Sequence, residues 1–263
     1  MAEPATDRIV AKKDGAVGWL VFNNPERRNA VSVEMWQAIP EVLADFAADP
    51  AIRVVVLAGA GDKAFASGAD ISQFEKHRAD AEGQRRYEQL GDAAMTRLRE
   101  LDKPTLAMIR GYCLGGGLNI AALCDLRLAA DDARFGIPAG KMGLGYRAGA
   151  MKSLVDLVGA AFAREIMLTA RQFSAAEALH MGLVHKVVPA GELASATRAY
   201  CDMIAANAPL TLRAAKRVIA EVTKASYDAA ACATWVKECF ESEDYAEGRR
   251  AFMEKRKPVF KGR

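Results

Sequence analysis

At 263 residues the chain is long for one average domain and short for two, so one domain with an appendage is expected. Its 51% hydrophobic and 26% charged residues are typical of a soluble protein with a large core, and no apolar run approaches the roughly 20 residues of a membrane span. The net charge of +3 is unevenly distributed, because residues 249–263 hold seven Lys/Arg and one Glu while residues 1–248 sum to −3.

The basic tail has two open interpretations, a solvated helix end or a contact with a phosphate-bearing ligand. Nucleic acid is not expected, because no aromatic residues are interleaved with the basic ones. Five cysteines without a CxxC pair and three histidines without metal-ligand spacing argue against a disulfide scaffold and a zinc site. With no signal-peptide pattern in MAEPATDR, a cytoplasmic location is expected.

The first predicted elements are a hairpin and a helix. Residues 9–13 and 17–22 flank Asp14-Gly15, a dipeptide typical of a hairpin turn. Ser32 then caps an amphipathic helix that reaches about residue 47.

Three buried strands follow, predicted from the apolar runs at 53–58, 105–109 and 126–130. Helical patterns fill the intervals, notably at 80–101 and 116–123. This alternation of strand and helix predicts an α/β fold.

From about residue 192 the pattern becomes wholly helical. One helix ends near Asn207-Ala208-Pro209, and further helices are predicted at 210–224, 227–241 and 243–256. A helical tail of this length after an α/β body is expected to pack on a neighbouring subunit.

Two glycine-containing segments each follow a predicted strand. They are FASGADI at 65–71 and GYCLGGGLNIAALCD at 111–125. Three glycines before an apolar helical run leave unpaired N–H groups at a helix start, which attract negative charge. Two such donors converging on one point form an oxyanion hole, which suits a carbonyl whose oxygen gains charge during reaction. A triple glycine alone is as well explained by tight turns and close packing, and no phosphate-binding GxxxxGK[ST] or GxGxxG motif is present.

The two segments resemble the signature regions of the crotonase (enoyl-CoA hydratase/isomerase) superfamily. The second signature spans residues 102–138, and the resemblance covers nearly the whole chain. It includes NPERRNAVS at 24–32, TARQFSAAEALHMGLVHKVVP at 169–189 and EDYAEGRRAFMEKRKPVF at 243–260.

The resemblance implies a spiral of ββα units with an acyl-CoA site over residues 1–191. A helical oligomerisation region is implied at 192–263, which would build homotrimers or homohexamers. The oxyanion hole maps onto the backbone N–H groups of Ala69 and Gly116. The substrate itself would carry coenzyme A, and no permanently bound cofactor, nucleic acid or membrane partner is expected.

Coenzyme A contacts are also implied by the resemblance. The adenine-binding loop maps onto Ala66, Asp70 and Ile71, and a basic residue near Arg27 would approach the pyrophosphate. Phe252 and Lys255 match positions that often reach a neighbouring subunit's coenzyme A.

The chain departs from the hydratase pattern at both catalytic glutamates. Asn119 and Ala139 stand where the hydratases of this family carry the two carboxylates that position and activate water. A placed acid or base is commonly worth about 10²–10⁴ in rate. Asn119 can orient water or thioester but is not a base, and it equally suits a helix start that satisfies local backbone groups.

The segment at 140–154, GKMGLGYRAGAMKSL, offers other groups. Its Gly143-Leu144-Gly145-Tyr146 resembles the loop of methylmalonyl-CoA decarboxylases, whose tyrosine aligns with Tyr146. Those enzymes carry a histidine where this chain has Ala69. Tyr146 could donate to a carboxylate or leaving group and Arg147 could bind a carboxylate bidentately, or the two could simply be packed and solvated.

Weaker acid/base candidates lie in the variable segment after residue 71, namely Glu75, His77, Glu88 and Asp92. The leading hypothesis is a hydratase-like lyase that works through a stabilised thioester enolate. The alternatives are a decarboxylase of a malonyl-type CoA thioester and an acyl-CoA-binding protein without catalysis.

Overall fold

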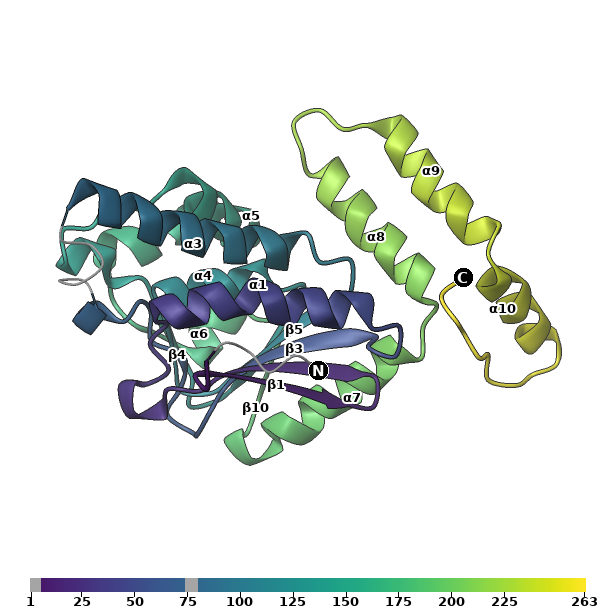
Figure 1. Cartoon of the computed structure of the whole chain (residues 1–263), viewed down its shortest axis with the longest axis horizontal. Helices are drawn as coiled ribbons and strands as arrows, with labels where there is room; N and C mark the ends of the chain where they lie inside the picture. The colour runs from purple at the N-terminus through teal and green to yellow at the C-terminus, as the bar shows by residue number, and fades with distance from the viewer. Residues whose placement is uncertain (1–5, 74–79) are drawn as a thin grey trace.

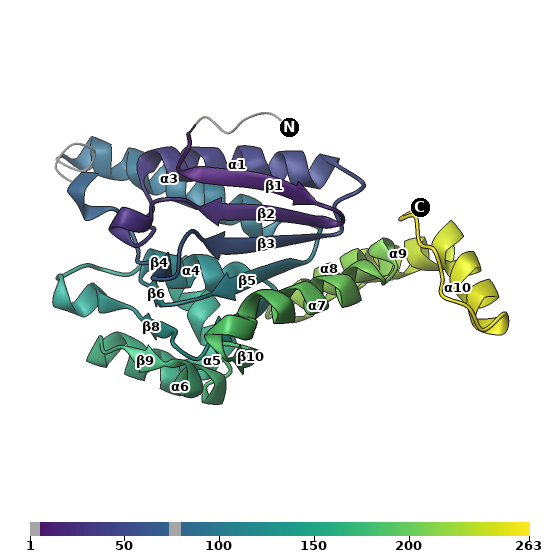
Figure 2. The same cartoon turned by 90° about the horizontal axis from the view of Figure 1, so that it is seen from below.

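The computed structural model describes residues 6–73 and 80–263, which form two β-sheets, the helices packed on them and a helical arm (Figures 1 and 2). The larger sheet has the order β1 (Ile9–Asp14), β2 (Val17–Phe22), β3 (Val54–Gly59), β5 (Thr105–Ile109), β7 (Leu126–Ala130), β10 (Lys186–Val188). The smaller sheet has the order β4 (Ala64–Ala66), β6 (Tyr112–Leu114), β8 (Arg134–Gly136), β9 (Phe173–Ser174).

The predicted hairpin and first helix are confirmed. Strands β1 and β2 pair antiparallel from Ile9↔Phe22 to Asp14↔Val17, and Gly15 takes the left-handed backbone (φ +60°) that the turn requires. Helix α1 (Val33–Ala48) begins after Ser32, whose hydroxyl accepts a hydrogen bond from the backbone N–H of Met35.

A ββα unit repeats along the chain. Three strands of the larger sheet, β3, β5 and β7, are each followed by a short strand of the smaller sheet and then by a helix. The helices of these units are α3 (Ala81–Arg99), α4 (Gly116–Leu123) and α5 (Ala148–Thr169). The larger sheet is parallel from β2 to β10, so the chain winds as a spiral, and the predicted α/β class is confirmed.

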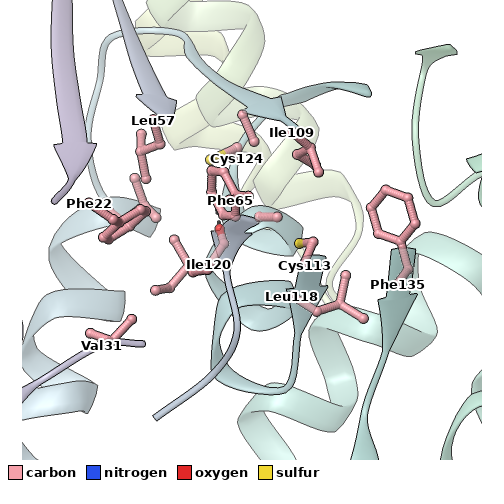
Figure 3. Close-up of a cluster of buried hydrophobic side chains, with 14 of the residues drawn as sticks. Phe22, Val31, Leu57, Phe65, Ile109, Cys113, Leu118, Ile120, Cys124 and Phe135 are labelled. Atoms are coloured by element: carbon pink, nitrogen blue, oxygen red, sulfur yellow. Dashed lines mark hydrogen bonds between the residues drawn. The ribbon is translucent and has the colours of Figure 1, made fainter. Parts of the chain in front are cut away.

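Both faces of the larger sheet are covered, which explains the continuous apolar run in β3. Val55 and Leu57 belong to the core shared with α1, whereas Val54 and Val56 face α7 (Leu193–Ala205) on the other side. Phe22 and Phe65 meet edge to face, with ring centroids 5.4 Å apart, in the centre of the main core (Figure 3).

The C-terminal helices extend away from the body as an arm (Figure 2). The arm consists of α8 (Pro209–Val222), α9 (Ala229–Phe240) and α10 (Glu243–Met253); the short α6 (Ala175–His180) belongs to the body. Ion pairs of 2.8 Å from Lys216 to Asp125 and from Arg217 to Asp102 fix α8 to the body. Among the described residues no helix is both long and apolar enough to cross a membrane.

Candidate active site

The two glycine segments meet at one edge of the smaller sheet. Strands β4 and β6 are parallel neighbours, so the loop after β4 and the start of α4 lie at the same edge. A Cβ placed on Gly116 would lie 3.8 Å from the backbone nitrogen of Ala69, and one placed on Gly68 would lie 3.7 Å from the nitrogen of Gly116. The backbone nitrogens of Ala69 and Gly116 therefore lie close together.

Neither of these two N–H groups donates a hydrogen bond within the described part of the chain. Val31 donates to the carbonyl of Gly68 and accepts from the N–H of Asp70, which leaves the N–H of Ala69 between them without a partner. Gly116 is the first residue of α4 and has no intrahelical acceptor. The pair thus presents two free donors, reinforced by the positive end of a helix dipole.

Glycine is required here for geometry as well as for exposing the donors. A Cβ on Gly117 would lie only 2.2 Å from the carbonyl oxygen of Ala66, so α4 can approach β4 only without a side chain at that position. Gly68 (φ +109°) and Gly115 (φ +51°) have backbones that other residues rarely adopt. Close packing and donor exposure are therefore two consequences of the same segment.

Asn119 and Tyr146 lie beside each other. Asn119 is half-buried, one turn into α4, and Tyr146 precedes α5. Burial raises the pKa of the Tyr146 phenol to about 12, and the nearby Asn119 amide offsets part of this rise. The Tyr146 hydroxyl is buried and has no hydrogen-bond partner among the described residues. It is a neutral donor at physiological pH.

Ala139 is buried beside this region, in the 3-10 turn Pro138–Lys141, and supplies no functional group. The two positions at which relatives carry glutamates thus hold an amide and a methyl group. Glu88 and Asp92 lie on α3, and both approach Arg147. Glu75 and His77 lie outside the described residues.

Arg147 is engaged by Asp92 in a bidentate ion pair, with Nη1–Oδ2 and Nη2–Oδ1 distances of 2.6 and 2.7 Å. Glu88 lies 4.0 Å from the same guanidinium. Both partners of the bidentate pair are more than half exposed. The structure does not bring the Arg147 side chain together with the buried Tyr146 hydroxyl.

Four of the predicted coenzyme A contacts cluster around β4. Ala66 ends β4, Asp70 is buried, and Ile71 is 56% exposed. Arg27 reaches Asp70 with an Nη1–Oδ1 distance of 3.1 Å. Phe252 is not part of this cluster, because it lies on α10 in the arm.

Phe252 is 83% exposed, and the exposed Lys255 follows α10 with a left-handed backbone (φ 53°). The arm extends away from the body (Figure 1), so one chain does not bring these two residues to its own β4. They are available to another molecule.

A polar pocket of about 680 Å³ was not predicted from the sequence. It lies where β4, β6 and β8 begin, at the opposite ends of these strands from the free N–H pair. The Arg28 guanidinium lies over the Tyr112 ring, 4.9 Å from its centroid. The charged residues that line the pocket are Glu26, Arg28, Asp62, Lys63, Asp132 and Arg134. They come from three separate segments of the chain, 26–28, 62–63 and 132–134, so no single sequence motif predicts the pocket.

Other titratable groups have structural roles. Asp125 accepts from the N–H and hydroxyl of Thr105 as well as from Lys216, which is a structural role. Burial raises the pKa of the Cys113 thiol and raises that of Cys124 to about 12, so neither is a thiolate nucleophile. No group of three or more His, Cys, Asp or Glu among residues 6–73 and 80–263 is arranged to hold a metal ion.

The spiral of ββα units and the pair of free N–H groups at a helix start define an enzyme of the crotonase superfamily. A sequence model of the enoyl-CoA hydratase/isomerase family matches residues 12–263, and the chain belongs to this family. The predicted crotonase-type fold is thereby confirmed.

Relatives are similar over nearly their whole length. A short-chain-enoyl-CoA hydratase from Clostridium acetobutylicum is 35% identical over 253 residues, covering 95% of this chain and 96% of that protein. A carnitinyl-CoA dehydratase from Proteus mirabilis is 32% identical over 258 residues, with 95% and 96% covered. The structure of an enoyl-CoA hydratase/carnithine racemase from Magnetospirillum magneticum superposes with a TM-score of 0.93 at 37% identity, covering 99% of this chain and 97% of that one.

Proposed function

We propose that this protein is a hydratase-like lyase acting on an acyl-CoA through a thioester enolate held by the N–H groups of Ala69 and Gly116. The observation that carries the proposal is the proximity of these two free donors, because a Cβ built on Gly116 would lie 3.8 Å from the Ala69 nitrogen. Donors aimed at a developing oxyanion are worth about 10²–10³ in rate each. Relatives described as hydratases and dehydratases support this class of reaction.

Coenzyme A would extend from these donors along β4. Ala66, Asp70 and Ile71 would contact the adenine, with Arg27 near the pyrophosphate. The polar pocket adds Arg28 and other cationic groups for the phosphates of the same ligand.

In the proposed assembly, residues 1–191 form the acyl-CoA core and residues 192–263 the oligomerisation region of a homotrimer or homohexamer. Phe252 and Lys255 of a second copy would complete the coenzyme A site. Their exposure on an arm directed away from the body supports this arrangement. The substrate supplies the coenzyme A, and no permanently bound cofactor is proposed.

The acid/base chemistry cannot follow the two-glutamate pattern, because Asn119 and Ala139 occupy those positions. Tyr146 and Asn119 would orient water or a leaving hydroxyl through hydrogen bonds. The unpartnered, neutral Tyr146 hydroxyl supports a donor role.

A second candidate is decarboxylation of a malonyl-type CoA thioester. Loss of carbon dioxide leaves an enolate that needs the oxyanion donors but no carboxylate base. The proximity of Asn119 to Tyr146, in a site without either glutamate, favours this reaction. Retention of the donor pair without turnover would instead indicate an acyl-CoA-binding protein.

The test is mass spectrometry of thioesters after incubating the purified protein with crotonyl-CoA, malonyl-CoA and methylmalonyl-CoA separately. The leading proposal predicts gain of water on crotonyl-CoA. Loss of carbon dioxide from either malonyl-type substrate, without hydration, would replace it with the decarboxylase. No conversion, combined with tight binding of acetyl-CoA, would contradict both and favour the binding protein.

A further inference from the structure

The Arg147 side chain connects the start of α5 to the surface of α3. Asp92 accepts from both terminal nitrogens of the guanidinium, at 2.6 and 2.7 Å, and Glu88 lies 4.0 Å away. Glu88 and Asp92 are four residues apart and therefore share one face of α3. Two like charges so placed repel each other, and the guanidinium compensates both.

Tyr146 and Arg147 face opposite ways. Arg147 precedes the first turn of α5 with a non-helical backbone (φ −76°, ψ 148°), and the two adjacent side chains have different surroundings. Tyr146 is buried toward Asn119, whereas the Arg147 side chain is 51% exposed and already bound to a carboxylate. The guanidinium is therefore directed away from the acyl end of the site.

The preceding segment has few other anchors. Residues 140–145 are exposed and include Gly140, Gly143 and Gly145. The N–H groups of Met142 and Leu144 both donate to the carbonyl of Ala139, which leaves the following residues dependent on side-chain contacts. Immobilising the tyrosine therefore requires the burial of its ring and the adjacent ion pair.

We propose that Arg147 and Asp92 are a positioning pair that holds Tyr146 in place, and that Arg147 does not bind a substrate carboxylate. This inference rests on the proposed role of Tyr146 at the acyl-CoA site. It also implies which groups a substrate carboxylate would contact: a carboxylate on the acyl group would meet the neutral donors of Tyr146 and Asn119, and not the Arg147 guanidinium.

The first test compares Arg147→Gln and Asp92→Asn with Lys152→Gln. Lys152 forms a similarly exposed ion pair with Asp156 within α5 itself, so it is a matched control. Hydrogen–deuterium exchange of residues 140–147 should rise in the first two variants and stay at the wild-type level in the control. Unchanged exchange in all three would overturn the proposal, and this readout needs no turnover.

The second test uses the thioester that the wild type converts. A misplacement of about 1 Å can cost 10²-fold in rate, so partial loss of position predicts kcat about 10-fold lower in Arg147→Gln and Asp92→Asn, with KM nearly unchanged. The charge-reversed double variant Arg147→Asp/Asp92→Arg should recover most of kcat. Failure of the double variant to exceed the single variants would contradict a positioning pair.

Ligand affinities distinguish a role of Arg147 in positioning Tyr146 from a role in binding the substrate carboxylate. Acetyl-CoA and malonyl-CoA should bind Arg147→Gln with the same affinity ratio as the wild type, with mass spectrometry confirming that malonyl-CoA survives the titration. A loss of more than 10-fold for malonyl-CoA alone would show that Arg147 binds the substrate carboxylate. If the wild type converts no thioester, the proposed function fails, and hydrogen exchange still decides whether the pair holds the segment.

Discussion

Tyr146→Phe should stabilise the free protein while impairing the enzyme. The hydroxyl of Tyr146 is buried and has no hydrogen-bond partner among the described residues, so its removal breaks no hydrogen bond there. A buried unsatisfied polar group costs about 1–3 kcal/mol, and replacing it with an apolar group of the same shape recovers part of that cost. We expect the free energy of unfolding to rise by about 1 kcal/mol, because the ring itself is retained.

The assay is urea denaturation without ligand, at one fixed protein concentration because the chain is expected to oligomerise. For a protein of this size, a gain of about 1 kcal/mol corresponds to a rise in Tm of roughly 2–4 °C. Turnover should fall at the same time by about 10²-fold, the low end for a placed proton donor.

Destabilisation of Tyr146→Phe by 1 kcal/mol or more would refute this reasoning, because it would show that the hydroxyl has a partner in the free protein. Stabilisation with an unchanged rate would instead make Tyr146 a packing residue. Phe162→Leu, a substitution in the packed body of α5, serves as a control that should lower stability without selectively lowering kcat.

Other substitutions test the neighbouring backbone. Gly116→Pro should lower kcat by about 10²–10³ with little loss of stability, because proline is tolerated at the first helical position but lacks the N–H. Gly116→Ala, whose methyl would meet no atom closer than 3.8 Å, should keep most of the activity. Equal losses of activity in the two variants would indicate a steric effect. Gly117→Ala should destabilise the protein by more than 1 kcal/mol in urea denaturation, since its Cβ would lie 2.2 Å from the Ala66 carbonyl oxygen. Gly91→Ala in α3 is the control: it has open space around it and should not destabilise the protein. Because burial raises the pKa of Tyr146 to about 12, the folded protein holds this proton more tightly than the unfolded chain, whose tyrosine titrates near 10. The free energy of unfolding should therefore fall between about pH 10 and 12, and it should fall less in Tyr146→Phe. An identical pH dependence in the wild type and the variant would contradict the burial of the hydroxyl.

The long elements were predictable because their residues carry strong local signals. Strands β5 and β7 and helix α4 have the predicted bounds. A short apolar run between polar residues predicts a strand, and an apolar helical run beginning at the triple glycine predicts a helix. The short strands β4, β6 and β8 were not predicted. Three residues are too few to show a period of two, and their pairing depends on turns of the spiral distant in sequence.

The site was predictable in part for the same reason. Ala69 and Gly116 follow predicted strands, and the structure brings their backbone nitrogens together, although their catalytic role stays a prediction. The ion pair of Arg147 with Asp92 was not predictable, because it joins the residue before α5 to α3 across 55 residues of chain. Helix α5 was not predicted, because the glycine-rich segment at 140–154 hides the beginning of the helix at Ala148.

The central claim is that the N–H groups of Ala69 and Gly116 stabilise a thioester enolate. The most direct measurement is a near-ultraviolet difference spectrum of acetoacetyl-CoA, whose enolate absorbs, with wild type, Gly116→Pro and Gly116→Ala at one pH. The account predicts a strong enolate band with wild type and Gly116→Ala, and loss of that band with Gly116→Pro although the ligand still binds. An enolate band of equal strength with Gly116→Pro, or no band with saturated wild-type protein, would contradict it.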